Sequence, residues 1–297
     1  MKKRTIIALI VAAALILSGG MILLLGLSFA GDASYVEAGM VSQEATLTDS
    51  FDSVAINTRD CDVKFVPYNG DVDAQVTVTG MSDSVSHSIL VEDGTLKIDM
   101  IDERKWTDHI NIGWTESMEM TVYLPAAEYE SLQVRTDTGD IVLTQEPFFR
   151  EVMLRSDTGD ISCVGVSGDA LDCMTRTGDI SVQNSAPNIL KLQSSTGDFK
   201  VRVVAGDEIH MKTNTGEVDA ENVNVQMFTC STNTGDVKLE KVLAEDYLQV
   251  FTDTGDICST NSDAPKVNIE TDTGDITIPA AWEFQQIETN TGDIYFA

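Results

Sequence analysis

The chain has 297 residues, with 48 Asp or Glu against 19 Lys or Arg, so its formal net charge is −29. A surface this acidic repels nucleic acid, anionic lipid and polyanionic wall polymers, so we expect no direct binding of these unless metal ions form a bridge. The five cysteines lack CxxC spacing and the three histidines are scattered, which indicates neither a disulfide framework nor a zinc site nor a nucleophile–base pair.

The first element is an apolar segment that we interpret as a membrane anchor. Residues 1–5 form a basic stub, and residues 6–30 contain no charged side chain. A helix over residues 6–30 would be about 37 Å long, enough to cross a bilayer with some tilt. The stub predicts a cytoplasmic N-terminus, with the bulk of a single-pass protein outside the bacterial cell membrane. The alternative is a cleaved signal peptide, because Ser28-Phe29-Ala30 resembles a small-x-small cleavage site.

The next part of the chain reads as a linker followed by irregular strands. Residues 31–50 are the expected linker, and residues 51–130 alternate apolar and polar positions in short runs. One run, ILVEDGTLKIDM, predicts a hairpin around Asp93-Gly94. Because the end of a repeat array needs a cap, we expect degenerate β coils and an N-terminal cap over 51–130.

Residues 131–297 contain a repeat of mostly 19 residues built on the tripeptide TGD or TGE. Its Gly occurs at 139, 159, 178, 197, 216, 235, 255, 274 and 292. Apolar residues stand mainly seven and five positions before each Gly and two after it, and Thr or Ser stands three before it. Such alternation predicts two strands with one buried face, joined at a sharp corner made by the Gly. A second, looser corner, with turn residues such as Gly206-Asp207, leads to the next repeat.

Two arrangements of these strands compete, an antiparallel meander and a parallel β-solenoid. The solenoid is favoured because like residues then lie above one another in neighbouring coils, forming ladders of Thr on Thr and Ile on Ile. We therefore predict an all-β chain, a parallel β-solenoid of about nine 19-residue coils with a less regular N-terminal cap, preceded by one transmembrane helix. The last coil shows no cap in the sequence, so self-association through this uncapped C-terminal coil is a further expectation.

These features together resemble a known family. Repeated TxTGDI strands, the preceding DGTLKI and VYLP, and one N-terminal apolar segment are similar to the bacterial "putative adhesin" family of β-strand repeat proteins, over roughly residues 50–297. The resemblance implies a β-solenoid exposed at the cell surface, with a role in adhesion or the envelope-stress response. It supplies no catalytic residues, since that family has none established.

The acids at the corner are the candidate functional residues. An acid follows every Gly of the repeat, and an Asp also stands two before it in some copies. In one interpretation these carboxylates accept hydrogen bonds from N–H groups of the turn. In the other, the pairs hold Ca²⁺ between coils, as β-roll repeats do at their turns. The candidate Ca²⁺ ligands are Asp137, Asp140, Asp157, Asp160, Asp253, Asp256, Asp272 and Asp275.

The second acid is not present in every coil. Five copies carry Arg176, Ser195, Asn214, Asn233 and Asn290 in its place, and the double glycine of Ca²⁺-binding β-rolls is missing. No cofactor other than Ca²⁺ is expected.

The function that these patterns favour is a non-catalytic binding or structural module of the bacterial cell envelope. Its expected partners are the membrane, through residues 6–30, and a surface protein or glycan. Candidate contact residues on the outward strand positions are Met153, Met174, Met227, Tyr247 and Phe251.

The alternative function is a carbohydrate-active β-helix enzyme, which needs a local cluster of carboxylates in a groove. Here carboxylates recur at every coil, and only Arg176 marks one coil out. Ice binding through the Thr array is disfavoured, because the Thr three before each Gly shares the parity of the buried columns.

We interpret the cysteines of the buried columns and the tryptophans as packing residues. Cys163, Cys173 and Cys230 fall in buried columns, where a thiol acts as a small hydrophobe. The three tryptophans lie near the ends of the predicted solenoid and favour cap packing over a sugar platform. They are Trp106, Trp114 and Trp282.

Overall fold

The computed structural model describes residues 41–68, 74–81, 85–102, 118–144, 148–282 and 285–297, all within one compact unit, Val41–Ala297. Within these residues every element is a β-strand except one 3-10 turn, η2 (Ala280–Trp282). The predicted anchor at residues 6–30 lies outside the described residues. Among the described ones, no helix is long and apolar enough to span a bilayer. The anchor and the signal peptide therefore both stay predictions.

The N-terminal part combines an antiparallel cap with irregular coils. Its strands are β1 (Val41–Leu47), β2 (Ser53–Asn57), β3 (Cys61–Tyr68), β4 (Ala74–Met81), β5 (Val85–Glu92), β6 (Thr95–Asp102) and β7 (Met118–Pro125). β5 pairs antiparallel with β6 across the predicted turn at Asp93-Gly94, and β4 pairs antiparallel with β1 and β7. β2 and β3 pair parallel with strands on both sides, so they form a coil that lacks the TGD corner.

The repeat region forms two long parallel sheets joined at the Gly corners. The strands that lead into the corners are β8 (Glu128–Thr138), β10 (Phe148–Thr158), β12 (Ser167–Thr177), β13 (Ile180–Gln193), β15 (Glu208–Lys212), β16 (Val218–Thr234), β17 (Val237–Thr254), β19 (Val267–Thr273) and β21 (Gln286–Thr291). The strands confined to the other side are β9 (Ile141–Leu143), β11 (Ile161–Val164), β14 (Phe199–Ala205), β18 (Ile257–Thr260), β20 (Ile276–Ile278) and β22 (Ile294–Phe296). β13, β16 and β17 run from one corner around the coil to the next.

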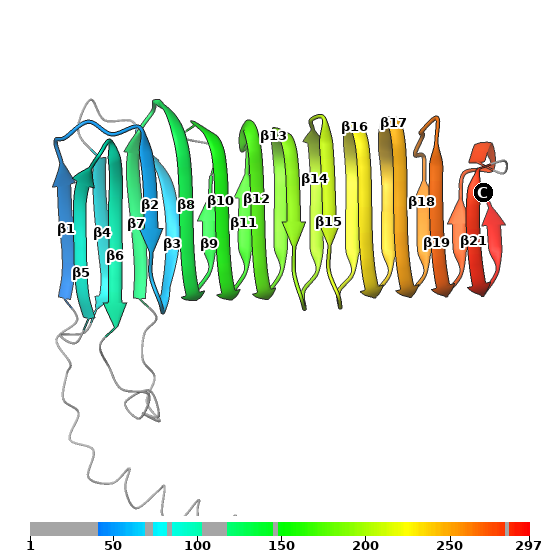
Figure 1. Ribbon diagram of the computed structural model, residues 1–297, viewed down its shortest axis with the longest axis horizontal. Coiled ribbons are helices and arrows are strands. Elements are labelled where there is room, and N and C mark those ends of the chain that lie inside the picture. The colour runs from blue at the N-terminus through cyan, green and yellow to red at the C-terminus, as the bar shows by residue number, and fades with distance from the viewer. Residues whose placement is uncertain (1–40, 69–73, 82–84, 103–117, 145–147, 283–284) are drawn as a thin grey trace, which may run out of the picture. The chain divides into compact units, whose positions relative to one another are not determined.

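The register of these strands is set by the repeat itself. Leu132 pairs with Val152, Val152 with Leu171 and Leu171 with Leu190, each residue lying above the one a repeat earlier. Coils therefore stack side by side along the unit, as the ribbon in Figure 1 shows. The predicted parallel β-solenoid of about nine coils is confirmed, and the antiparallel meander is excluded for the repeats.

Six of the described coils have a third side that the repeat pattern did not predict. Six residues after the corner Gly, the backbone takes a positive φ of 50–73°, which turns the chain after the second strand. These bend residues are Gly165, Asn184, Val203, Asn222, Lys241 and Asn261. The next residue, such as Val204 or Val223, is buried again. Four residue types occupy the bend position in different coils, so no common turn residue marks it in the sequence.

The core is the space enclosed by the three sides of the coils. It consists of the predicted apolar columns, and its largest fully buried side chains include Phe199, Phe228 and Trp282. Trp282 lies on η2 near the last coil, which agrees with the predicted cap packing, while Trp106 and Trp114 lie outside the described residues.

Candidate functional site

The corner Gly is required by the close approach of neighbouring coils. At Gly197, φ is +158° and an added Cβ would lie 1.8 Å from the carbonyl oxygen of Gly178. At the other repeat glycines the same atom would lie 1.9–2.2 Å from a backbone oxygen of the preceding coil. No L side chain fits such a position without moving the backbone, so the Gly of the motif is fixed by stacking.

The Thr or Ser three before each Gly forms a buried ladder, as its parity predicted. Each hydroxyl Oγ donates a hydrogen bond to the Gly carbonyl of the preceding coil, at 3.0 Å for Thr175 to Gly159 and 3.1 Å for Thr271 to Gly255. The same bond is made by Ser156, Ser194, Thr213, Thr232, Thr252 and Thr289. These hydroxyls are satisfied inside the molecule, so they do not form an outward Thr array.

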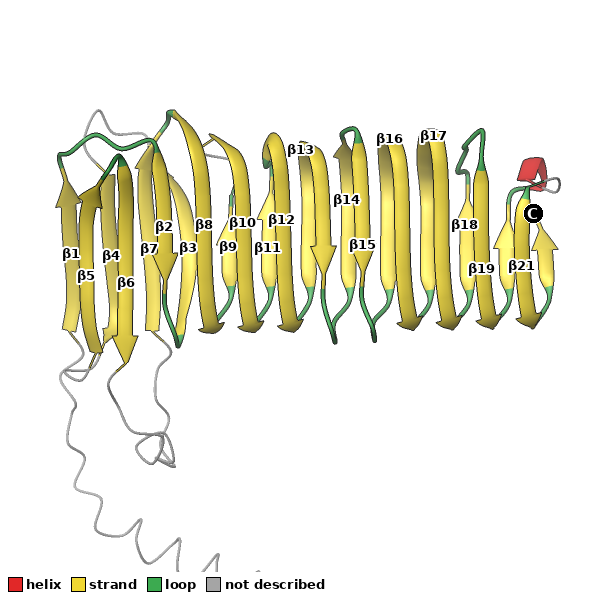
Figure 2. Cartoon of the chain, in the orientation of Figure 1, coloured by secondary structure: helices red, strands yellow, loops and turns green. Residues whose placement is uncertain are grey.

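In most coils the acid after the Gly accepts a hydrogen bond from the next coil rather than from its own turn. Oδ1 of Asp160 accepts the backbone N–H of Asp179 at 2.7 Å, and Oδ1 of Asp179 accepts that of Asp198 at 2.8 Å. The acceptors of this Asp ladder are Asp62, Asp140, Asp160, Asp179, Asp198, Asp236, Asp256 and Asp275. The carboxylates therefore join coils, and they lie at the exposed lower ends of the strands in Figure 2.

The proposed Ca²⁺ ligands divide between this ladder and a second row. The ladder holds Asp140, Asp160, Asp256 and Asp275, each with Oδ1 already bound to an N–H. The second row contains Asp137 on β8 beside Asp157 on β10, and Asp253 on β17 beside Asp272 on β19.

Acids of the second row have other partners. Asp157 forms an ion pair with Arg176 at 3.3 Å, and Asp272 Oδ1 accepts from Asn290 Nδ2 at 2.8 Å. In the part of the chain that the structure describes, no group of three or more His, Cys, Asp or Glu is placed to hold a metal ion. The Ca²⁺ hypothesis stays a prediction.

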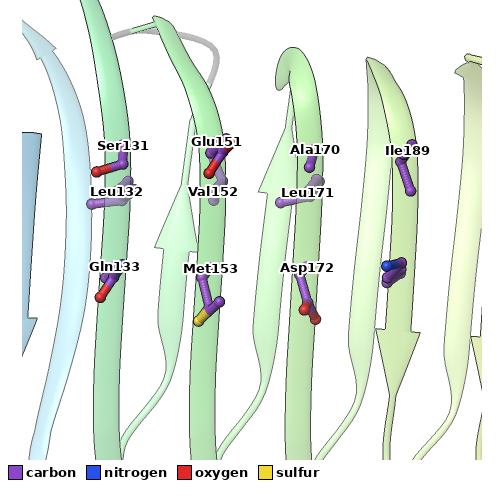
Figure 3. A pocket seen from close by; sticks show the side chains of 11 residues that line it. Ser131, Leu132, Gln133, Glu151, Val152, Met153, Ala170, Leu171, Asp172 and Ile189 are labelled. Atoms are coloured by element: carbon purple, nitrogen blue, oxygen red, sulfur yellow. The ribbon is translucent and has the colours of Figure 1, made fainter.

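The strands that precede the corners present a broad outward face, which we call the front sheet. Its members are β8, β10 and β12, the ends of β13, β16 and β17, and β15, β19 and β21. Two shallow hollows lie on it. The first, about 170 Å³, spans β8, β10, β12 and β13 and is lined by outward side chains including Glu151, Met153 and Asp172 (Figure 3).

The second hollow lies further along the same face and shares Lys191 with the first. It measures about 400 Å³ and spans β13, β15, β16 and β17. Its polar lining includes Lys191, Gln193, His210, Lys212 and Gln249, with Phe251 at one side. Of the sequence-predicted contact residues, Met153 lines the first hollow and Phe251 the second. No sequence pattern marked the hollows, because each is lined by residues from four different strands.

Two of the buried thiols lie close together. Cys163 on β11 and Cys173 on β12 face each other within one coil, with 3.9 Å between their Sγ atoms. Burial raises the pKa of Cys230 to about 12, and burial with the nearby Asp62 charge raises the pKa of Cys61 to about 12. The Cys163 contact and burial raise the pKa of Cys173 well above its usual value. These thiols are inert core residues.

Comparison with known proteins places the chain in a family. The family model described as Toastrack DUF4097 matches residues 51–227 and 206–297. The chain belongs to the Toastrack family. This agrees with the resemblance seen in the sequence. No curated protein matches the chain in sequence.

Of three similar solved structures, one reaches a TM-score above 0.5 and shows the same fold. A "putative lipid binding protein" from Parabacteroides distasonis has a TM-score of 0.54 and 16% identity, covering 88% of this chain and 98% of its own. A "putative adhesin" from the same species has a TM-score of 0.49 and 12% identity, covering 87% and 98%. Another "putative adhesin", from Bacteroides fragilis, has a TM-score of 0.47 and 12% identity, covering 87% and 97%. At 16% identity, the likeness to the "putative lipid binding protein" concerns the fold alone.

Proposed function

We propose that this Toastrack chain is a non-catalytic binding module of the bacterial cell envelope, held at the membrane by residues 6–30 with its solenoid outside the cytoplasm. The observation that carries the proposal is that the corner motif and the front sheet of each coil have different contacts. Thr, Gly and Asp of the motif bond mainly to neighbouring coils. The front sheet turns polar and aromatic side chains outward: some of them, such as Arg155 and His210, bond to outward neighbours, whereas Lys191 and Lys212 form no ion pair among the described residues. The motif builds the array, and the front sheet is left for a partner.

The adhesin and lipid-binding names of proteins with a similar fold support a binding role over catalysis. The enzyme alternative centred on Arg176, whose guanidinium lies 3.3 Å from Asp157 on an exposed part of the surface. Arg176 offsets the charge of Asp157 in an exposed ion pair. Neither residue lines a hollow. Glycosidase chemistry needs two carboxylates set across a sugar. No carboxylate lines the second hollow, and of the two that line the first, Glu151 and Asp172, the latter is paired with Arg155 at 2.9 Å.

The experiment is a capture screen with the full chain in mild detergent, run against surface glycans and envelope proteins, with and without Ca²⁺. Protease protection in intact cells tests the topology at the same time. Specific capture together with an accessible solenoid is expected. Turnover of a polysaccharide, a protected cytoplasmic solenoid, or a blank screen in both conditions would each contradict the proposal.

Self-association through the last coil belongs to the same proposal. Among the described residues, β21 pairs only with β19 and β22 only with β20. Light scattering of the full chain measures this: a concentration-dependent dimer is expected, and a strict monomer contradicts it.

A further inference from the structure

We propose that the second hollow of the front sheet, between β13 and β17, binds an acidic sugar, meaning a carbohydrate unit that carries a carboxylate. The inference rests on the proposed binding function and gives it a site and a ligand class.

The lining of this hollow is unusual for so acidic a chain. Although the sequence holds 48 acids, no carboxylate lines the hollow. Its side chains supply two ammonium groups, an imidazole, carboxamides and hydroxyls, which are donors or neutral groups that suit an anionic ligand rich in hydroxyls.

The two lysines are free to take a ligand. Lys191 and Lys212 are exposed, and neither lies within ion-pair distance of a carboxylate among the described residues. By contrast, Arg155 of the same face is paired with Asp172 at 2.9 Å. Lys191 pairs in register with His210, and Lys212 with Gln193, so the two lysines lie diagonally on adjacent strands, about 4.8 Å apart across the strands and two residues apart along them. Their long side chains extend from the same face, where one anionic ligand can lie between them.

The second acid row is interrupted beside this hollow. That row lies on the same outward parity, two residues before each Gly, and it is acidic at Asp137, Asp157, Asp253 and Asp272. In three of the hollow's four coils it reads Ser195, Asn214 and Asn233, while the fourth carries Asp253 on β17. The acid nearest to Lys191 in register is Asp172 on β12, whose charge Arg155 offsets in an ion pair at 2.9 Å, so the two lysines keep unpaired positive charge at the hollow.

His210 is fixed in place rather than free to rotate. Its Nδ1 lies 2.7 Å from Thr229 Oγ1, and its Nε2 lies 3.0 Å from Glu208 Oε2. Glu208 stands two residues before His210 on β15, and its carboxylate faces the imidazole. A tethered ring beside Lys191 gives the hollow a rigid wall, which lowers the entropy cost of binding.

Phe251 and the polar groups favour a sugar over a simple anion. The half-buried ring of Phe251 lies beside Gln249 and Ser231, so an apolar surface stands next to groups that hydrogen-bond hydroxyls. A hollow of about 400 Å³ falls within the range of small-ligand sites. The chain's charge of −29 opposes long polyanions at long range, so a short acidic oligosaccharide is the better match.

The test is calorimetric titration of the full chain in mild detergent with short oligosaccharides of galacturonate, glucuronate and sialic acid. Each is paired with its uncharged methyl ester, and a hexaglutamate peptide serves as a simple anion. The variant is Lys191→Gln with Lys212→Gln. Its matched control is Lys64→Gln with Lys200→Gln, two exposed and unpaired lysines on the opposite sheet. Phe251→Ala probes the ring.

We expect at least one acidic oligosaccharide to bind while its ester does not. The Lys191/Lys212 variant should weaken binding by about tenfold or more, the control should leave it unchanged, and Phe251→Ala should weaken it by about fivefold. The inference is overturned if no acidic sugar binds, if the esters bind equally well, if hexaglutamate binds as tightly, or if the two lysine pairs behave alike. Capture of another ligand, unaffected by Lys191 and Lys212, would sink the inference while leaving the proposed function standing.

Discussion

At the scale of single residues, the structure depends on a few backbone positions that tolerate no other side chain. The corner glycines are the clearest case, because the obstacle is a carbonyl oxygen of the coil below and not a movable side chain. The bend residues six positions later are a milder case, since Asn and Lys occupy a conformation that L residues enter at some cost.

We expect Gly197→Ala to lower the free energy of unfolding by about 3 kcal/mol or more, since both the contact with Gly178 and the backbone strain contribute. Thermal unfolding measures it. Gly94→Asn is the control, because Gly94 has φ of +74° and its nearest neighbour to an added Cβ is a side-chain oxygen 3.6 Å away. A Gly197→Ala protein as stable as the control would refute this account of the corner.

Val203 offers the opposite case, a residue whose replacement should stabilise the protein. It is an exposed β-branched residue with φ of 56°, at a bend where other coils carry Gly, Asn or Lys. Val203→Asn should raise the free energy of unfolding by about 1 kcal/mol, and Asn222→Val should lower it by a similar amount. If chemical denaturation shows both changes with the same sign, strain at the bend is not the cause.

The buried thiols predict a reactivity pattern and a pH dependence. At pH 8 a thiol reagent should label only the half-buried Cys258 in the native chain, and all five cysteines after denaturation. Because the folded-state pKa values of Cys61 and Cys230, about 12, exceed the usual 9.0, the unfolded chain loses protons first as pH rises. Their contribution to stability is therefore complete below pH 9 and is lost towards pH 12. Rapid native labelling of Cys230, or an unfolding midpoint that does not fall over this range, would contradict the burial.

At the scale of elements, the Asp ladder combines a favourable bond with an unfavourable charge. Each step gains a hydrogen bond between coils, and stacks like charges about 4.8 Å apart. Exposure to water keeps that repulsion near 1 kcal/mol per pair, which salt reduces further.

Substitution separates the two effects. Asp179→Asn keeps an acceptor for the N–H of Asp198 and removes one charge, so stability should stay equal or rise slightly, with less dependence on salt. Asp179→Ala removes the acceptor and should cost about 1 kcal/mol. Asp246→Asn, an exposed acid outside the ladder, controls for net charge. Equal unfolding midpoints for the Asn and Ala variants would show that the ladder bond contributes nothing.

Much of this element-level structure follows from parity in the sequence. Apolar columns at Leu190 and Ile180 face inward and outward residues such as Lys191 face solvent, because strands alternate and the repeat keeps the alternation in register. The third side was missed because its bend residue varies between coils. The sequence did not show that the Asp carboxylates bind N–H groups of the next coil. An Asp that binds its own turn and an Asp that binds the next coil occupy the same position in the motif.

At the scale of the whole molecule, the chain is a parallel β-solenoid of the Toastrack family in which one corner motif is used throughout. The repeated corner motif builds the solenoid, and the candidate site lies where the outward residues of neighbouring coils differ. Lys191, His210 and Lys212 lie where the outer acid row is broken, and no pattern that searches for repeated residues would select them. The hollow depends on side-chain packing across four coils, which the linear sequence does not display.

The repeated corner is an architectural element, and its acids join neighbouring coils through hydrogen bonds to backbone N–H groups. The most direct test of this arrangement is the thermal unfolding midpoint of the full chain in excess Ca²⁺ and in EDTA. If the eight predicted carboxylate ligands held Ca²⁺, binding at several corners would add stability at each site, and the shift would be large. We expect the thermal unfolding midpoint to be the same in excess Ca²⁺ and in EDTA. A midpoint that rises steadily with Ca²⁺ concentration and returns to its starting value in EDTA would contradict it.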